Sequence, residues 1–195
     1  MCPYERVVML EREIVNPRCP YCNVELNPVP QRRKKCPACG NVIHIKTRPS
    51  DRKRILTTED GAKAIDAEWT ALERARIDAR WRELNKELSS AAKSNDWHRM
   101  SSIYFGLALI RHDEGKEFFS VLQECARCNL IGFEKSGVVK RVKVLTCGEQ
   151  SCSECQPLQG QIFDIREALD KMPIPVRTCQ HDRGWCRCMY LPVMK

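Results

Sequence analysis

Four cysteines near the start of the chain have the residue type and spacing of a metal site. They form two Cys-x-x-Cys pairs, Cys19 with Cys22 and Cys36 with Cys39, and 13 residues separate the pairs. Such a turn places two thiolates side by side, and Zn²⁺ binds four thiolates as a tetrahedron with bonds of about 2.3 Å. Because four protein ligands leave no open coordination position, these cysteines predict a structural and not a catalytic zinc.

The residues around these pairs predict a small zinc ribbon over residues 1–47. Gly40 follows the second pair, where such turns usually need the positive φ that glycine adopts without strain. A domain of this size buries too little surface to fold alone, so metal binding is expected to supply the missing free energy. His44 lies just beyond the second pair, and with four thiolates present we interpret it as a strand residue.

A second group of candidate ligands lies in the C-terminal part of the chain. Cys152 and Cys155 repeat the Cys-x-x-Cys spacing. In an extended strand, residues two apart project to the same face, so Cys186 and Cys188 could reach one metal together. We predict a second structural zinc here, with a group of buried thiols and a labile disulfide as the alternatives.

This second group contains more candidate ligands than a tetrahedral ion uses. We rank Cys152 and Cys155 first and Cys186 next. The remaining place is open to three residues, which are Cys179, His181 and Cys188. The disulfide alternative would join Cys179 to Cys188.

Cys125 and Cys128 form a further Cys-x-x-Cys pair, but inside a run with helical periodicity. Their spacing matches the apolar stripe marked by Phe118, Leu122 and Leu130. A free cysteine is among the most buried residue types and packs as a small apolar group. We therefore interpret both as core thiols, with metal ligation as the alternative.

The choice between disulfides and metal sites depends on the compartment, because thirteen cysteines in 195 residues fit either. The first apolar run covers only Val7–Leu10, which is too short for a secretory signal. No apolar run approaches the roughly 18 residues that a membrane-spanning helix needs. We therefore expect a cytoplasmic protein with no membrane partner, whose reduced cysteines bind zinc in preference to iron.

Positive charge is concentrated at the N-terminal end of the chain. The formal net charge is +8, and residues 1–58 hold 12 Lys/Arg against 5 Asp/Glu, which is +7. A basic patch beside a metal module indicates nucleic acid or another acidic partner, with a solvated surface as the alternative. The candidate phosphate-binding residues lie at the predicted hairpin tip and behind the ribbon: Arg32, Arg33, Lys34, Lys35, Arg52, Lys53 and Arg54.

The pattern between the two cysteine groups is helical. Residues 48–57 have the composition of a basic linker, and residues 58–132 form a helical region. A long amphipathic helix is expected over about residues 58–90, capped by Thr57 or Thr58, with an apolar stripe that slips near residue 76. Two further helices are expected over residues 96–112 and 117–130.

Residues 133–195 are predicted to form a cysteine-rich C-terminal module. It contains a strand within residues 135–146 and a short helix over 164–171, capped by Asp164 and ended by Pro173. The predicted fold class is therefore α+β, with a zinc ribbon, a helical middle region and a zinc-stabilised α+β tail.

The order of short motifs in the tail resembles that of a known family. The motifs are CSEC at 152–155, LQGQIF at 158–163, PIP at 173–175, CRC at 186–188 and PV at 192–193. Over residues 140–195 this order resembles the C-terminal segment of phage minor head (head-morphogenesis, Mu F-like) proteins. The resemblance implies a phage or prophage protein that acts in head or portal assembly as a minor capsid component. It also implies portal or capsid proteins as partners, and a location in the virion or the bacterial host cytoplasm.

The sequence lacks the common catalytic signatures. It contains no HExxH and no P-loop, and its His-x-Glu at residues 112–114 is not followed by the Pro-Cys-x-x-Cys of a zinc deaminase. We predict a protein that is not an enzyme and has no small-molecule substrate. A metal-dependent nuclease built around His181 and Asp182 is the remaining enzymatic alternative. The other function in view is a nucleic-acid-binding zinc-ribbon protein with a regulatory role, for which DNA is the partner.

Four apolar side chains of the tail have two interpretations. They are Leu158, Ile162, Phe163 and Pro175. Held rigidly by a metal, they suit a docking surface, because little entropy is lost when a partner binds. Alternatively, they fill the small core of the tail itself.

Overall fold

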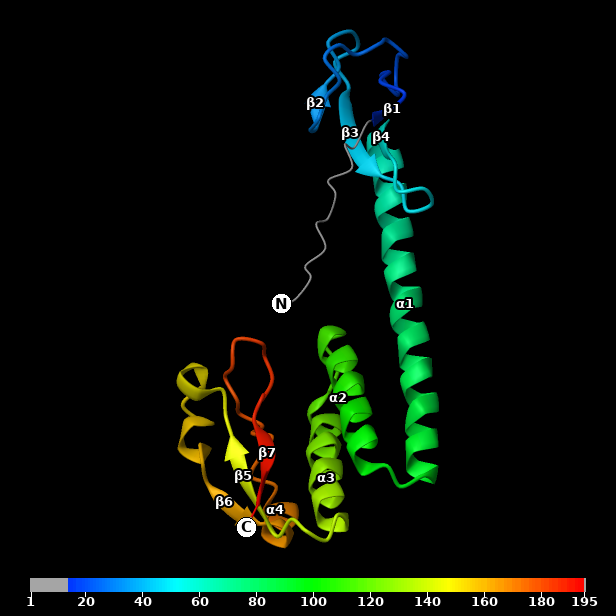
Figure 1. Ribbon diagram of the computed structural model, residues 1–195. Helices are drawn as coiled ribbons and strands as arrows, with labels where there is room; N and C mark the ends of the chain where they lie inside the picture. The colour runs from blue at the N-terminus through cyan, green and yellow to red at the C-terminus, as the bar shows by residue number, and fades with distance from the viewer. Residues whose placement is uncertain (1–13, 195) are drawn as a thin grey trace, which may run out of the picture. The chain divides into compact units, whose positions relative to one another are not determined.

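The structure, a computed structural model, describes residues 14–194 of the chain (Figure 1). The described part is mixed α+β, with four α-helices and two small sheets. The chain divides into two compact units between Arg76 and Ile77, where the sequence predicted four segments. The mixed composition agrees with the predicted fold class.

The N-terminal unit contains a four-stranded sheet of order β1-β4-β3-β2. Strand β3 is antiparallel to both β2 and β4, and β1 is parallel to β4. The core is small and consists of Leu26, Ile43 and Leu56 together with two buried cysteines. The strands are β1 (Ile14–Val15), β2 (Lys34–Lys35), β3 (Val42–Thr47) and β4 (Arg54–Thr57).

Strand β4 occupies the end of the segment whose composition is typical of a linker. Its residue Leu56 is 9% exposed and pairs with Ile45 of β3, so the segment closes a hairpin. An ion pair of 2.6 Å between Arg48 and Asp51 stabilises the turn. Charge and proline suggested a linker, whereas pairing with a distant strand decides the structure of this segment.

Helix α1 (Glu59–Lys93) begins where the sequence predicted, because the hydroxyl of Thr58 accepts a hydrogen bond of 3.1 Å from the amide of Gly61. Residues on its apolar face contribute contacts to both units. In the N-terminal unit, the Trp69 indole N–H donates to the carbonyl of Thr47 at 2.8 Å. In the C-terminal unit, Leu84 belongs to a separate core. The slip of the stripe near residue 76 therefore coincides with the division between the units.

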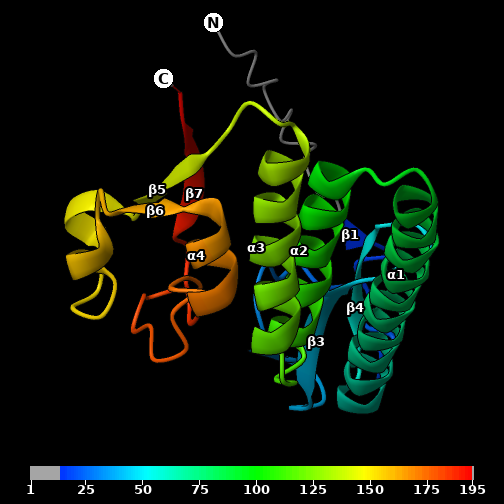
Figure 2. The same cartoon turned by 90° about the horizontal axis from the view of Figure 1, so that it is seen from below.

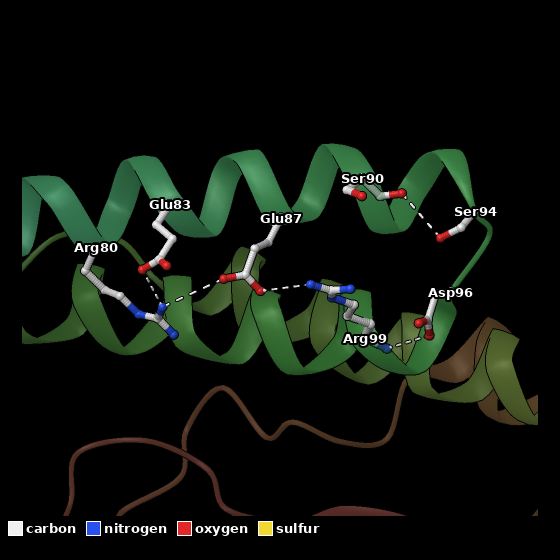
Figure 3. A network of polar contacts seen from close by, with 7 residues as sticks. All are labelled: Arg80, Glu83, Glu87, Ser90, Ser94, Asp96 and Arg99. Carbon is white, nitrogen blue, oxygen red and sulfur yellow. Dashed lines mark hydrogen bonds and ion pairs between the residues drawn. The ribbon is translucent and has the colours of Figure 1, made fainter.

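Helix α2 (Trp97–Asp113) turns back along the end of α1. Their shared core contains Leu84, Ala91, Ile103 and Leu107. Figure 3 shows the polar network above this core, in which Glu87 lies 3.5 Å from Arg99 and 3.9 Å from Arg80. Asp96 caps α2 by accepting from the amide of Arg99. Exposed ion pairs contribute about 0–1 kcal/mol each, so the apolar cluster is the main contact.

Helix α3 (Phe119–Lys135) packs along α2 and lies between α2 and α4 (Figure 2). The two helices approach closely at Gly132, where a Cβ atom would lie 2.9 Å from the ring of His98. Cys125 and Cys128 lie on α3 as predicted, and Cys128 is buried. The hydroxyl of Ser101 on α2 donates to the carbonyl of Cys125 at 2.8 Å.

The tail forms a three-stranded antiparallel sheet of order β6-β5-β7, packed on α3 and α4. As predicted, Asp164 caps α4 by accepting from the amide of Arg166 at 2.9 Å. The elements are β5 (Arg141–Leu145), β6 (Ile162–Asp164), α4 (Ile165–Lys171) and β7 (Met189–Val193). Two single-turn 3-10 helices, η1 (Gly148–Gln150) and η2 (Gln156–Leu158), connect β5 to β6.

From the sequence, four apolar tail residues could form either a docking surface or part of the core, and most of them lie in the core. Leu158 and Phe163 pack against the cluster that contains Leu130, Val142 and Ile174. Pro175 is buried as well. Ile162, at 50% exposure, is the one member of the four that faces solvent. These side chains therefore do not form the exposed docking surface, because the sheet and α4 cover most of them.

Candidate metal centres

The four cysteines of the predicted N-terminal site converge as the spacing predicts. The sulfurs of Cys19, Cys22, Cys36 and Cys39 all lie within 4.8 Å of one another. Two of the separations, Cys19 to Cys39 and Cys22 to Cys36, are 3.8 Å. Bonds of about 2.3 Å from a tetrahedral Zn²⁺ place its sulfurs about 3.8 Å apart. A disulfide would need about 2.05 Å. The sulfurs are therefore spaced for one tetrahedral ion.

The two turns that carry these sulfurs repeat one backbone geometry. In each, the amide of the first cysteine donates to the carbonyl five residues later, at 2.9 Å for Cys19 and 2.8 Å for Cys36. The residue after the second cysteine has a positive φ, 60° at Asn23 and 72° at Gly40. The role predicted for Gly40 is confirmed, and asparagine, the residue that tolerates this conformation next best, fills it in the first turn.

Local hydrogen bonds favour the metal-binding form of Cys36. The amide N–H groups of Cys39 and Ala38 donate to its sulfur and lower its pKa to about 6, although burial opposes them. The side-chain amide of Asn41 donates to the sulfur of Cys39 at 3.5 Å. Since the thiolate is the ligand, this turn holds Cys36 ready to bind a cation at neutral pH.

The tail cysteines form two overlapping groups of three. One contains Cys152, Cys155 and Cys179, and the other contains Cys155, Cys186 and Cys188. Cys179 lies 3.7 Å from Cys152 and 3.6 Å from Cys155, while Cys186 lies 3.8 Å from Cys155. The structure thus brings together all five cysteines predicted for the second centre, with Cys155 common to both groups.

Hydrogen bonds act differently on the individual cysteines of the tail group. The thiol of Cys188 donates to the sulfur of Cys186, which lowers the pKa of Cys186 to about 5 and raises that of Cys188. Burial opposes a charge on Cys152, but the amides of Gln180 and Cys155 outweigh it and lower the pKa of Cys152 to about 7. The hydrogen bond between them thus favours the thiolate form at Cys186 and the thiol form at Cys188.

Cys179 lies closer to the other tail sulfurs than its place in the ligand ranking suggested, and His181 lies further from them. Cys179 contacts both members of the Cys152–Cys155 pair. The ring of His181 lies outside both sulfur groups, and its Nδ1 is 2.6 Å from Asp182 and 3.1 Å from the amide of Arg183. The loop after α4 decides this arrangement, and sequence spacing carried no signal for its path.

The seven predicted phosphate-binding cations all belong to the N-terminal unit, but they do not form one cluster. Lys34 and Lys35 form the short strand β2 and are exposed. The guanidinium of Arg52 lies over the Trp69 ring at 4.4 Å. Three of the seven, Arg32, Arg33 and Arg54, line one cavity.

That cavity contains two residues that sequence reasoning did not assign to it, His44 and Lys46. Both lie on β3, as predicted for His44. Residues two apart in a strand share a face, so the alternation in Val42–Thr47 was the available signal. The predicted linker included Arg54, but the sequence did not reveal that Arg54 lies beside strand β3.

The C-terminal unit has a cavity of about 410 Å³ between α2, α3 and residues 174–190. Its walls include Phe105 and Trp185, whose rings meet edge-on at 5.2 Å, and the two cysteines of the CRC motif. The cavity therefore borders the second sulfur cluster on the side of Cys186 and Cys188.

Within residues 14–194, none of the helices has both the length and the apolar character to cross a membrane. Comparison of the chain with protein-family models, with curated proteins and with solved structures finds no match.

Proposed function

We propose that this chain is a non-enzymatic zinc-binding protein of phage or prophage origin that acts in head or portal assembly. One observation carries the proposal: the motifs of the tail resemblance fold into a single module. The CSEC motif follows β5, the CRC motif leads directly into β7, and β5 pairs with β7 from Arg141 to Leu145. The sulfurs of both motifs meet beside that pairing.

Both centres are proposed to be structural zinc sites, and the N-terminal one a zinc ribbon. Cys19 and Cys36 are themselves members of the N-terminal core, which otherwise contains few apolar side chains. Thiolate sets with tetrahedral spacing suit zinc or iron among the common metals. Zinc fits a purely architectural role because it has no redox chemistry. Elemental analysis distinguishes the two ions.

The assembly role is tested by sedimentation with purified portal–capsid assemblies. The tagged protein is expected to move with the assemblies, and Cys152→Ser/Cys155→Ser to remain at the top of the gradient because its tail lacks the metal. Lys143→Gln, an exposed change on β5, is the control and should sediment like the native protein. Native protein that stays at the top in the presence of assemblies would exclude this role.

Uncompensated positive charge favours a second candidate function, nucleic-acid binding with a regulatory role. The guanidinium of Arg54 is held at 3.1 Å by two neutral oxygens of Gln31, and no carboxylate among residues 14–194 forms an ion pair with it. Seven phosphate contacts would give a log–log slope of affinity against salt of about −6 for duplex DNA. Replacing residues 32–35 by alanine should flatten that slope by roughly 3 to 4 units with zinc retained. An unchanged slope would place the binding elsewhere.

A further inference from the structure

The strongest unassigned feature is a polar cavity of about 510 Å³ on the sheet of the N-terminal unit. Side chains from three segments line it: Arg32 and Arg33 before β2, His44 and Lys46 on β3, and Arg54 on β4. The register of the sheet brings them together, because Arg54 pairs with Thr47 at the end of β3. We call this feature the basic cavity.

The charge of the basic cavity is mostly uncompensated. Lys46 pairs with Asp66 of α1 at 2.7 Å. The carboxylate of Glu59 also interacts electrostatically with Arg33 and His44, but it forms an ion pair with Lys63 at 3.0 Å. Within the described residues, no ion pair to a carboxylate involves Arg32, Arg33 or Arg54. Four cations and one paired carboxylate leave the cavity strongly positive.

One side chain of the basic cavity has a fixed orientation, and another has a polar atom without a partner. Gln31 accepts from both terminal nitrogens of Arg54, which fixes the plane of the guanidinium and leaves its remaining N–H groups to bind elsewhere. Within residues 14–194, the buried Nε2 atom of His44 has no hydrogen-bond partner, and His44 lines the cavity. A buried polar atom without a partner lowers stability, so a small local shift that brought it to a bound anion would be favourable.

We propose that the basic cavity is a phosphate-binding site that seats one backbone phosphate of a nucleic acid. Phosphate presents several acceptor oxygens at once, which the planar forks of arginine match better than a single ammonium does. The proposal rests on the second candidate function and sharpens it. It divides the seven predicted cations into Arg32, Arg33 and Arg54, which hold one phosphate, and the others, which act through diffuse attraction.

Paired variants of the full, zinc-loaded chain test this division with a labelled DNA duplex and fluorescence anisotropy. Arg33→Gln/Arg54→Gln removes two charges from the basic cavity. Lys34→Gln/Lys35→Gln removes two charges from exposed β2, just outside it. The cavity variant should flatten the salt slope by about 1 unit, because its arginines share one phosphate, and the β2 variant by up to about 2 units. The cavity variant should bind about tenfold or more weakly than the β2 variant, since it also loses oriented hydrogen bonds. Equal losses in the two variants would overturn the site.

Zinc content and melting temperature are compared with those of the native chain to show that both variants fold.

The imidazole signals of the four histidines give an independent readout by NMR. Inorganic phosphate and a short phosphodiester are each expected to shift His44 and to leave His98, His112 and His181 in place. A shift of His44 with inorganic phosphate, without DNA binding, would support the phosphate site but reject nucleic acid as the source of the phosphate. DNA binding without any shift at His44 would keep the candidate function and reject the site.

Discussion

At the scale of single residues, the tail centre has one thiol more than a tetrahedral ion uses. The hydrogen bond between Cys186 and Cys188 lowers the pKa of Cys186 and raises that of Cys188. Because a metal binds thiolates, Cys186 is the better ligand and Cys188 the spare. The sequence ranking also placed Cys186 ahead of Cys188, and the hydrogen bond between them gives that order a physical reason.

Serine substitutions separate the two cysteines. The native chain is expected to hold about two zinc ions, and Cys186→Ser about one, because a hydroxyl is a poor zinc ligand. Cys188→Ser should keep about two, since four thiolates remain. Elemental analysis of the purified proteins measures this. The reverse pattern would make Cys188 the ligand, and a native value near one would remove the tail site.

Phe163 and Ile162 are neighbours on β6 with opposite surroundings. Phe163 packs against the tail core, whereas Ile162 is 50% exposed. We expect Phe163→Ala to destabilise the chain by about 3 kcal/mol, from lost burial and the cavity left behind. Ile162→Ala should change stability by about 0.5 kcal/mol or less. Thermal or urea unfolding gives both values, and equal losses would contradict the burial seen here.

At the scale of elements, the close approach of α2 and α3 depends on Gly132. A methyl group there would lie 2.9 Å from the His98 ring, closer than real contacts allow. Gly132→Ala should therefore lower the melting temperature, although alanine is the better helix former by about 1 kcal/mol. In a His98→Ala background the same change should be neutral or stabilising. Additive losses in the double variant would show that His98 is not the obstacle.

Elements set by local chemistry were predictable, and those set by distant contacts were not. Thr58 and Asp164 cap helices through their own side chains, so sequence located both helix starts. The four-cysteine set was predictable because each of its turns is a local hydrogen-bonded unit. Strand β4 was missed because its pairing with β3 depends on the fold of the whole N-terminal unit. The basic cavity was missed for the same reason.

At the scale of the whole molecule, we expect metal removal to affect the N-terminal unit and the helices α2 and α3 differently. Sulfurs form part of the N-terminal core, whereas the core shared by α1 and α2 is purely apolar and aromatic. Excess chelator should therefore collapse the amide dispersion of residues 14–57 while α2 and α3 keep their signals. Two-dimensional NMR follows both sets of amides in one sample. An N-terminal unit that keeps its dispersion would show that the sheet folds without metal.

The position of the tail sulfurs along the chain has a topological consequence. Cys152 and Cys155 precede β6 and α4, and Cys179 and Cys186 follow them. A bound ion would thus crosslink the two ends of that segment and restrict the unfolded chain as a disulfide does, but reversibly. A protease cut at exposed Arg177 would then leave two fragments clasped together until a chelator freed them. The tail would thus stay together after cleavage through metal–sulfur bonds that a reducing compartment leaves intact.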